Sequence, residues 1–110
     1  MRQAKRGRIV AIASRQALEP AANLSAYNVS KAGLMALVRT AALENKDLGI
    51  TVNAILPGAM NTETNRQTMP DADASQWVRT EQVAALAVFL VSSAAAQITG
   101  AAVPIYGFSI

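Results

Sequence analysis

Three short apolar runs, separated by two stretches of helical periodicity, constrain the fold of this chain more than any other feature. The runs occupy residues 8–13, 50–56 and 101–105. They are too short for helices and rich in β-branched residues, which is typical of buried strands. Apolar residues recur at spacings of three and four over about 25–46 and 80–93, as in helices that bury one face. This alternation predicts an α/β protein with a parallel three-stranded sheet and right-handed crossovers.

Turn and capping residues mark where these elements end. Gly49 follows the first helix and suits a left-handed cap, and Thr80 is expected to cap the second helix. Pro104 places the last strand at an edge of the sheet, where a missing N–H does no harm. Residues 57–79 are polar and without periodicity. They predict a long irregular loop, which in a compact domain is often a functional lid.

Each helix is expected to bury one apolar stripe against the sheet. In the first helix the stripe consists of Leu34, Leu37, Val38 and Ala41. In the second helix it consists of Val83, Leu86, Ala87, Leu90 and Val91.

Composition narrows the class of protein. The 110 residues suit one small domain, and 52% of them are hydrophobic, enough for a packed core. No apolar run approaches the roughly 18 residues of a membrane span, no signal peptide is visible, and cysteine is absent. These features together favour a cytoplasmic protein.

Charge and metal-binding residues give weaker signals. The net charge is +3, and Arg2, Lys5, Arg6 and Arg8 crowd the N-terminus. Without a recognition motif or interleaved aromatic residues, this cluster favours a solvated chain end over a nucleic-acid site. The sequence contains no histidine, and the aspartates in residues 71–73 are expected to be solvated, so no metal site is predicted.

A possible proton-transfer pair lies on the first helix. Tyr27 and Lys31 are four residues apart and therefore share a helix face. A neighbouring ammonium favours the ionised form of a phenol, which suits such a pair to acid–base chemistry. By itself the spacing favours an ordinary surface pair, because Tyr-x-x-x-Lys often arises by chance. However, Ser14 and Pro57-Gly58 follow the first two strands, and open parallel sheets bind ligands at that edge. Three suitable groups are therefore expected to converge there.

Four segments resemble the short-chain dehydrogenase/reductase family, in the order in which that family carries them. Residues 7–14, GRIVAIAS, look like its serine-bearing strand, and residues 27–33, YNVSKAG, look like its Tyr-x-x-x-Lys helix. Residues 51–58, TVNAILPG, followed by Thr62, resemble its nicotinamide-side motif, and residues 98–100, ITG, resemble the segment before its last strand. The resemblance implies the C-terminal half of a Rossmann-type doubly wound parallel sheet, with three strands and two main helices.

The resemblance also implies an activity and a role for each matching residue. The activity would be NAD(P)-dependent oxidoreduction of a small-molecule carbonyl or alcohol, or of an imine. Tyr27 would exchange a proton with the substrate oxygen, Lys31 would favour the ionised tyrosine and hold the nicotinamide ribose, and Ser14 would hydrogen-bond the substrate oxygen. The cofactor, NAD or NADP, would be contacted by Tyr27, Lys31, Pro57, Gly58, Ala59, Met60 and Thr62.

Two partial resemblances leave the substrate open. Residues 61–66 and 69–73, with Trp77, look like a loop of dihydropteridine reductases. The serine strand and residues 103–107 look more like the ordinary bacterial reductases. Arg15 and Arg66 are interpreted as solvent-exposed. Many family members end in an Asp-Gly-Gly stretch, where this chain has YGF at residues 106–108, so any contact made by that aspartate is not expected here.

The dinucleotide fingerprint of the family has no counterpart here. The chain has six glycines, none close enough to another to form G-x-G-x-x-G, and the family's adenosine-reading residue and catalytic Asn are also missing. We therefore expect residues 1–110 to form a single partial Rossmann-like domain of a truncated family member, without the dinucleotide-binding half and inactive alone. The alternative is a non-catalytic protein that only folds and self-associates. The unpaired edge of strand 8–13 favours a homo-oligomer in either case.

Overall fold

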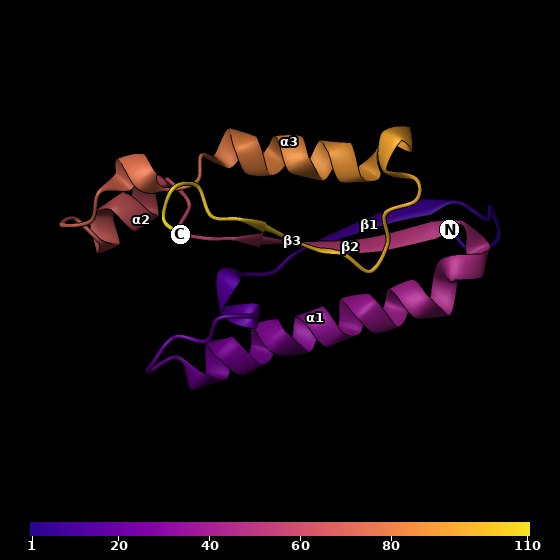
Figure 1. The fold of residues 1–110 in the computed structure, drawn as a ribbon, viewed down its shortest axis with the longest axis horizontal. Coiled ribbons are helices and arrows are strands. Elements are labelled where there is room, and N and C mark those ends of the chain that lie inside the picture. Colours follow the sequence, from indigo (N-terminus) through magenta and orange to yellow (C-terminus); the bar gives the residue numbers. More distant parts are fainter.

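The computed structural model describes all residues, Met1–Ile110, and contains one parallel sheet between two helices (Figure 1). The strands are β1 (Gly7–Ile12), β2 (Ile50–Pro57) and β3 (Ala102–Ile105), in the order β1-β2-β3. Helix α1 (Ser25–Asn45) covers one face of the sheet and α3 (Thr80–Val91) covers the other. The predicted α/β class, parallel sheet and edge position of the Pro104 strand are confirmed.

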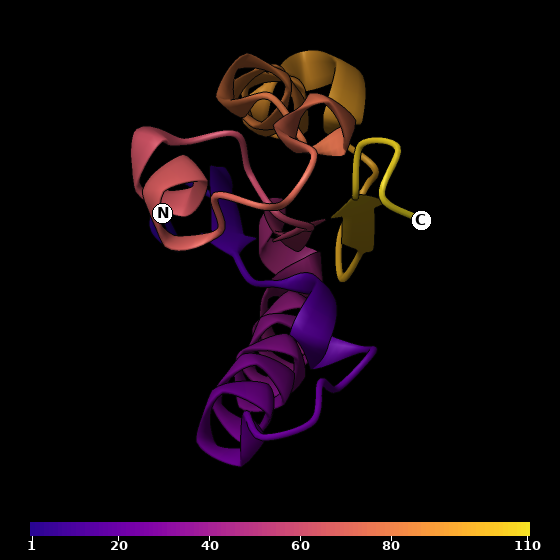
Figure 2. The same ribbon diagram turned by 90° about the vertical axis from the view of Figure 1, so that its left-hand side faces the viewer.

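One of the two crossover connections is left-handed, so the prediction of right-handed crossovers was wrong for it. The reason is that α1 and α3 lie on opposite faces of the sheet. The strands follow one another across the sheet in chain order and all run in one direction. The β1–α1–β2 crossover is right-handed, but β2–α3–β3 passes over the other face and is left-handed (Figure 2). The long connection 58–79 gives the chain room to reach that face. As a result β2, the central strand, is buried along its whole length.

The connection between β2 and α3 is more regular than the sequence suggests. It contains the short helix α2 (Glu63–Thr68) and one turn of 3₁₀ helix, η3 (Ala74–Gln76). A six-residue helix is too short to show a periodic stripe, so the prediction of an irregular loop was wrong there. The expected cap of α3 was also one residue too late, because Arg79 is the N-cap and Thr80 lies in the first turn.

Three further single turns of 3₁₀ helix complete the chain: η1 (Arg15–Ala17), η2 (Lys46–Leu48) and η4 (Ser93–Ala95). Gly49 closes η2 in the left-handed region at φ 64°, as predicted. The first of these turns, η1, follows β1 directly and forms part of the site described below.

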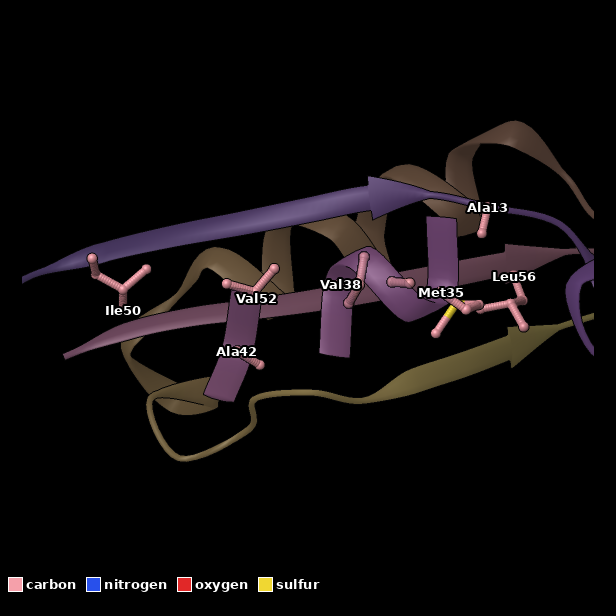
Figure 3. Close-up of a cluster of buried hydrophobic side chains, with 8 residues drawn as sticks. Ala13, Met35, Val38, Ala42, Ile50, Val52 and Leu56 are labelled. Atoms are coloured by element: carbon pink, nitrogen blue, oxygen red, sulfur yellow. The ribbon is translucent and has the colours of Figure 1, made fainter. Parts of the chain in front are cut away.

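The core has two layers, one on each face of the sheet. The layer under α1 contains eight buried side chains, seven of which are labelled in Figure 3: Ala13, Met35, Val38, Ala42, Ile50, Val52, Ala54 and Leu56. The layer under α3 contains four: Ile55, Val78, Val83 and Leu90. Residues of β2 alternate between the layers, as the period of a strand requires.

The helical stripes are close to the predicted ones but rotated. On α1, Val38 is buried and Leu34 and Ala41 are half-buried, whereas Leu37 is 64% exposed and Met35 and Ala42 take its place in the core. On α3, the buried positions are Val83 and Leu90, while Val91 is exposed. Because both helices are rich in apolar residues, periodicity alone did not fix which side faces the sheet.

Candidate active site

The carboxyl ends of β1 and β2 meet the N-terminal turns of α1 and the helix α2 at one end of the sheet, on the left in Figure 1. A pocket of about 350 Å³ opens there. Its twelve lining residues are Ile12, Ala13, Ser14, Arg15, Gln16, Tyr27, Pro57, Gly58, Ala59, Met60, Asn65 and Met69. The structure therefore brings together six of the eight residues that the sequence predicted for this site.

Ser14 lies at the point where β1 ends and η1 begins. The Ala13 N–H donates to the Ile55 carbonyl (2.8 Å), which extends the β1–β2 pairing to the residue before the serine. Ser14 is extended (φ −162°, ψ 156°) and only 6% exposed. Its hydroxyl donates to Oε1 of Gln16 and accepts from the Gln16 N–H (3.3 Å). Backbone pairing on one side and a side-chain cap on the other thus hold the serine in place.

Tyr27 and Lys31 lie on the first turns of α1, one turn apart. Tyr27 lines the pocket and is 44% exposed. The Lys31 Nζ lies 5.7 Å from the centroid of the Tyr27 ring, within the range of a cation–π contact. Lys31 is half-buried and not among the lining residues. The pair has the shared face that the spacing predicted, and only the tyrosine of the pair lines the pocket.

The opposite wall of the pocket follows β2. The Gly58 N–H donates to the Ile105 carbonyl (2.9 Å), and the Ala59 carbonyl accepts from the Val78 N–H (2.9 Å). The N–H groups of Ala59 and Met60 have no hydrogen-bond partner within the chain. Two adjacent free donors at the pocket wall fit a ligand carbonyl such as the nicotinamide carboxamide.

Thr62, the last predicted cofactor contact, lies beyond the pocket lining. Its hydroxyl accepts from the Asn65 N–H (3.1 Å) and caps α2. The cap brings Asn65 to the pocket, where its Nδ2 donates to the Met60 carbonyl (2.8 Å). In this arrangement Thr62 builds the wall that Met60 and Asn65 present.

Six of the twelve lining residues were not predicted as site residues: Ile12, Ala13, Arg15, Gln16, Asn65 and Met69. The first four flank Ser14 in the sequence, so their position at the end of β1 was the available signal. Asn65 and Met69 lie on or just after α2, a helix too short to be seen in the sequence. Arg15 was interpreted as solvent-exposed; in the structure it is half-buried and hydrogen-bonded to a residue near the C-terminus.

A larger hollow of about 760 Å³ lies between the start of α3 and the C-terminal segment. It contains none of the residues predicted for catalysis, so the smaller pocket is the candidate active site. No cluster of three or more His, Asp or Glu side chains in the structure could hold a metal ion. None of the helices has both the length and the apolar character that crossing a membrane requires.

Comparisons with known proteins agree with the geometry. A family model described as enoyl-(acyl carrier protein) reductase matches residues 1–107. The D-beta-hydroxybutyrate dehydrogenase of Rhizobium meliloti is 36% identical over 92% of this chain. The chain belongs to the short-chain dehydrogenase/reductase family. It spans about half the length of the curated relatives it matches, 47% in the case of the Rhizobium enzyme.

Solved structures of the family superpose on the whole fold. A short-chain type dehydrogenase/reductase from Mycobacterium ulcerans has a TM-score of 0.90 at 29% identity, over 98% of this chain and 43% of that one. A protein from Agrobacterium tumefaciens whose crystal structure holds bound NADP has a TM-score of 0.86 at 31% identity, over 93% of this chain and 46% of that one. The Rossmann-type α/β fold that the sequence predicted is thereby confirmed.

Proposed function

We propose that this chain supplies the substrate-binding and proton-transfer part of an NAD(P)-dependent oxidoreductase acting on a small carbonyl compound or alcohol. The observation that carries the proposal is the convergence of Ser14, Tyr27 and the free N–H groups of Ala59 and Met60 on one pocket. A serine hydroxyl and a phenol on one side, with two donors on the other, can hold a substrate oxygen and a flat amide-bearing ring together.

Each residue has a distinct role in this proposal. Tyr27 gives a proton to the substrate oxygen during reduction and takes it back during oxidation, since its hydroxyl is the exposed acid–base group of the pocket. Ser14 holds the same oxygen through a hydrogen bond. Lys31, beside the Tyr27 ring, stabilises negative charge on the phenol oxygen through its own positive charge. A bound nicotinamide cofactor would supply or accept the hydride.

Only the nicotinamide end of such a cofactor finds matching groups in these 110 residues. The pyrophosphate of a dinucleotide is usually held by a glycine-rich turn at a helix N-terminus. None of the helices here is preceded by such a turn. We therefore propose that the chain alone binds NAD(P) weakly and shows no turnover, and that activity requires a partner segment that supplies the dinucleotide-binding half.

Calorimetric titration of the purified chain with NADH and NADPH tests the binding part of the proposal. We expect no binding tighter than about 100 μM, which corresponds to roughly 5.5 kcal/mol. Tight binding, or steady NADPH oxidation with a diketone or quinonoid pterin that Tyr27→Phe abolishes, would contradict the need for a partner segment.

A chimera tests the chemical part. The segment of the Rhizobium meliloti D-beta-hydroxybutyrate dehydrogenase that this chain matches is replaced by residues 1–110, so that the contacts of Phe108 and Ser109 are kept, and oxidation of D-β-hydroxybutyrate is followed. Tyr27→Phe is expected to lower kcat by roughly 10²–10⁴-fold, as for the loss of a general acid–base group. Ser92→Ala, which removes a hydroxyl at the far end of α3, is the matched control and is expected to leave kcat unchanged. An active chimera that is insensitive to Tyr27→Phe would refute the assignment.

A second candidate, a non-catalytic protein that only self-associates, is favoured by the apolar surface. Ile9 and Ile12 are exposed on β1, whose outer edge has no partner strand, and Leu37 and Leu43 are exposed on α1. Unpaired strand edges and apolar patches promote association. We propose that the chain is a homo-oligomer at tens of micromolar, a range that probes contacts of about 6 kcal/mol. Sedimentation showing only monomer, unchanged by Leu37→Lys, would contradict this.

A further inference from the structure

Arg15, the residue after the proposed substrate-binding serine, connects two segments that lie at opposite ends of the chain. Its Nη1 donates to the Ser109 carbonyl at 2.5 Å, across 94 residues of sequence. Its guanidinium also stacks on the Tyr106 ring, with Cζ 4.5 Å from the ring centroid. A charged group that bonds a carbonyl and stacks on an aromatic ring at once is held far more firmly than an ordinary surface arginine.

The same guanidinium is anchored within its own turn. Arg15 forms an ion pair with Glu19, with Nε–Oε2 at 3.2 Å and Nη2–Oε1 at 3.3 Å. The turn itself closes through backbone bonds from Ala17 to the Ser14 carbonyl and from Leu18 to the Arg15 carbonyl, both 3.0 Å. The side chain therefore fixes the conformation of η1, which carries Gln16 onto the Ser14 hydroxyl.

The C-terminal segment that receives Arg15 is itself attached to the loop before α3. The Phe108 N–H and the Ser109 hydroxyl both donate to the Gln76 carbonyl, each at 3.0 Å. Gly107 has φ 66°, and a Cβ there would lie 2.7 Å from that same carbonyl oxygen. Only glycine fits so close an approach in this backbone conformation.

Tyr106, on which Arg15 stacks, is itself partly buried and lies close to Glu19 and Gly58. Burial raises the pKa of Tyr106 above its ordinary value of 10.0, and a hydrogen bond to Glu19 and the negative charge of that carboxylate raise it further, while Arg15 lowers it. The Tyr106 backbone also lies against Gly58, where an added Cβ would be 3.2 Å from the Tyr106 Cα. The C-terminal segment thus touches both walls of the pocket.

We propose that Arg15 is a positioning residue. Its contacts connect the turn of Ser14 and Gln16 to the C-terminal segment 106–109, and they thereby fix the position of the serine wall of the pocket relative to the β2 wall. The role of Ser14 in this statement rests on the proposed function, whereas the mechanical link between the two segments does not. Arg15 does not act on substrate in this proposal, because its guanidinium is already engaged by Glu19 and Ser109.

Amide hydrogen exchange of the intact chain, without substrate or cofactor, tests the link. Arg15→Ala and Tyr106→Ala are each expected to raise the exchange rates of Ala17, Leu18 and Phe108 by roughly tenfold. Tyr106→Phe keeps the ring for stacking and should raise them much less. Arg39→Ala, which removes an exposed arginine on α1, is the matched control and should change none of them.

The pattern across both segments separates positioning from general destabilisation. A uniform rise in exchange over the sheet and helices, or a rise in η1 without a rise at Phe108, overturns the proposal. In the active chimera, Arg15→Ala is expected to lower kcat about tenfold, with little change in KM for the cofactor, and Arg15→Lys should restore less than half of the loss, because an ammonium lacks the planar fork. If the chimera is inactive while the exchange pattern holds, the proposed function fails and the link stands.

Discussion

The two faces of the sheet are stabilised by different interactions, although the central strand β2 contributes side chains to both. Toward α1, β2 contributes only apolar side chains to a layer of eight buried residues (Figure 3). Toward α3, the layer has four buried apolar residues, and β2 adds the polar Asn53 and Thr51 to that face. The α1 face therefore stabilises the fold by burial, whereas the α3 face uses buried hydrogen bonds to fix particular loops.

This difference matters for the site because its two walls rest on different faces of the sheet. Tyr27 and Lys31 lie on α1, which rests on the larger apolar layer. The β2 wall of the pocket continues into segments held by hydrogen bonds, such as Gly58 to Ile105 and Ala59 to Val78. Changes on the α1 face should therefore alter overall stability, and changes on the α3 face should alter individual loops first.

The largest effect is expected from a cavity on the α1 face. Leu56 is fully buried, and Leu56→Ala should lower the free energy of unfolding by about 2–5 kcal/mol. Leu43→Ala is the matched control, since Leu43 is 70% exposed on α1, and it should change stability by less than about 0.5 kcal/mol. Urea unfolding followed by circular dichroism measures both. Equal effects would contradict the importance of the α1 layer.

The next effect concerns the polar centre of the α3 face. Asn53 is fully buried; its Nδ2 donates to the Ile98 carbonyl (2.8 Å) and its Oδ1 accepts from the Ala101 N–H (3.0 Å). Asn53→Ala leaves two partly buried backbone groups, the Ile98 carbonyl and the Ala101 N–H, without their partner, at a cost of up to about 1–3 kcal/mol each. We expect faster amide exchange at Ala101 before any change in α1. A variant whose α1 amides exchange first would show that the two faces are not separate.

A smaller effect of opposite sign is expected at Thr51. Its Oγ1 is buried on the α3 face and has no hydrogen-bond partner in the structure. Thr51→Val replaces the hydroxyl with a methyl group of similar size and should raise the free energy of unfolding by about 1 kcal/mol. Thr40→Val, at an exposed position on α1, should not stabilise the chain. A destabilised Thr51→Val variant would mean that the hydroxyl has a role the packing does not reveal.

The smallest effect depends on pH and involves Tyr106 near the C-terminus. Since the pKa of Tyr106 is raised in the folded chain, the unfolded chain loses this proton first as pH rises past about 10. Stability should therefore fall above pH 10, and Tyr106→Phe should reduce the slope of that fall. Unfolding midpoints between pH 8 and 11 measure it. If the slope is unchanged in the variant, the loss of stability at alkaline pH is caused by a group other than Tyr106.

Much of the site followed from local sequence. Apolar runs placed the three strands, and the endings of the first two put Ser14 and Gly58 at the same edge of the sheet, since parallel strands share their carboxyl ends. The Tyr27–Lys31 pair was predicted from helical spacing, and the structure keeps the two side chains in contact. Whether these residues catalyse a reaction is still a prediction that the chimera tests.

The strand–helix order, the family motifs and the sheet edge that carries the polar groups could be predicted because they depend on residues near one another in the chain. Three features became visible only in the folded chain: the left-handed crossover over the α3 face, the use of Thr62 as a helix cap and the hydrogen bond from Arg15 to Ser109. Each of these depends on which distant segments pack together. Local periodicity does not predict such contacts, because they join residues that are distant in the sequence and contribute free energy only after the chain has folded.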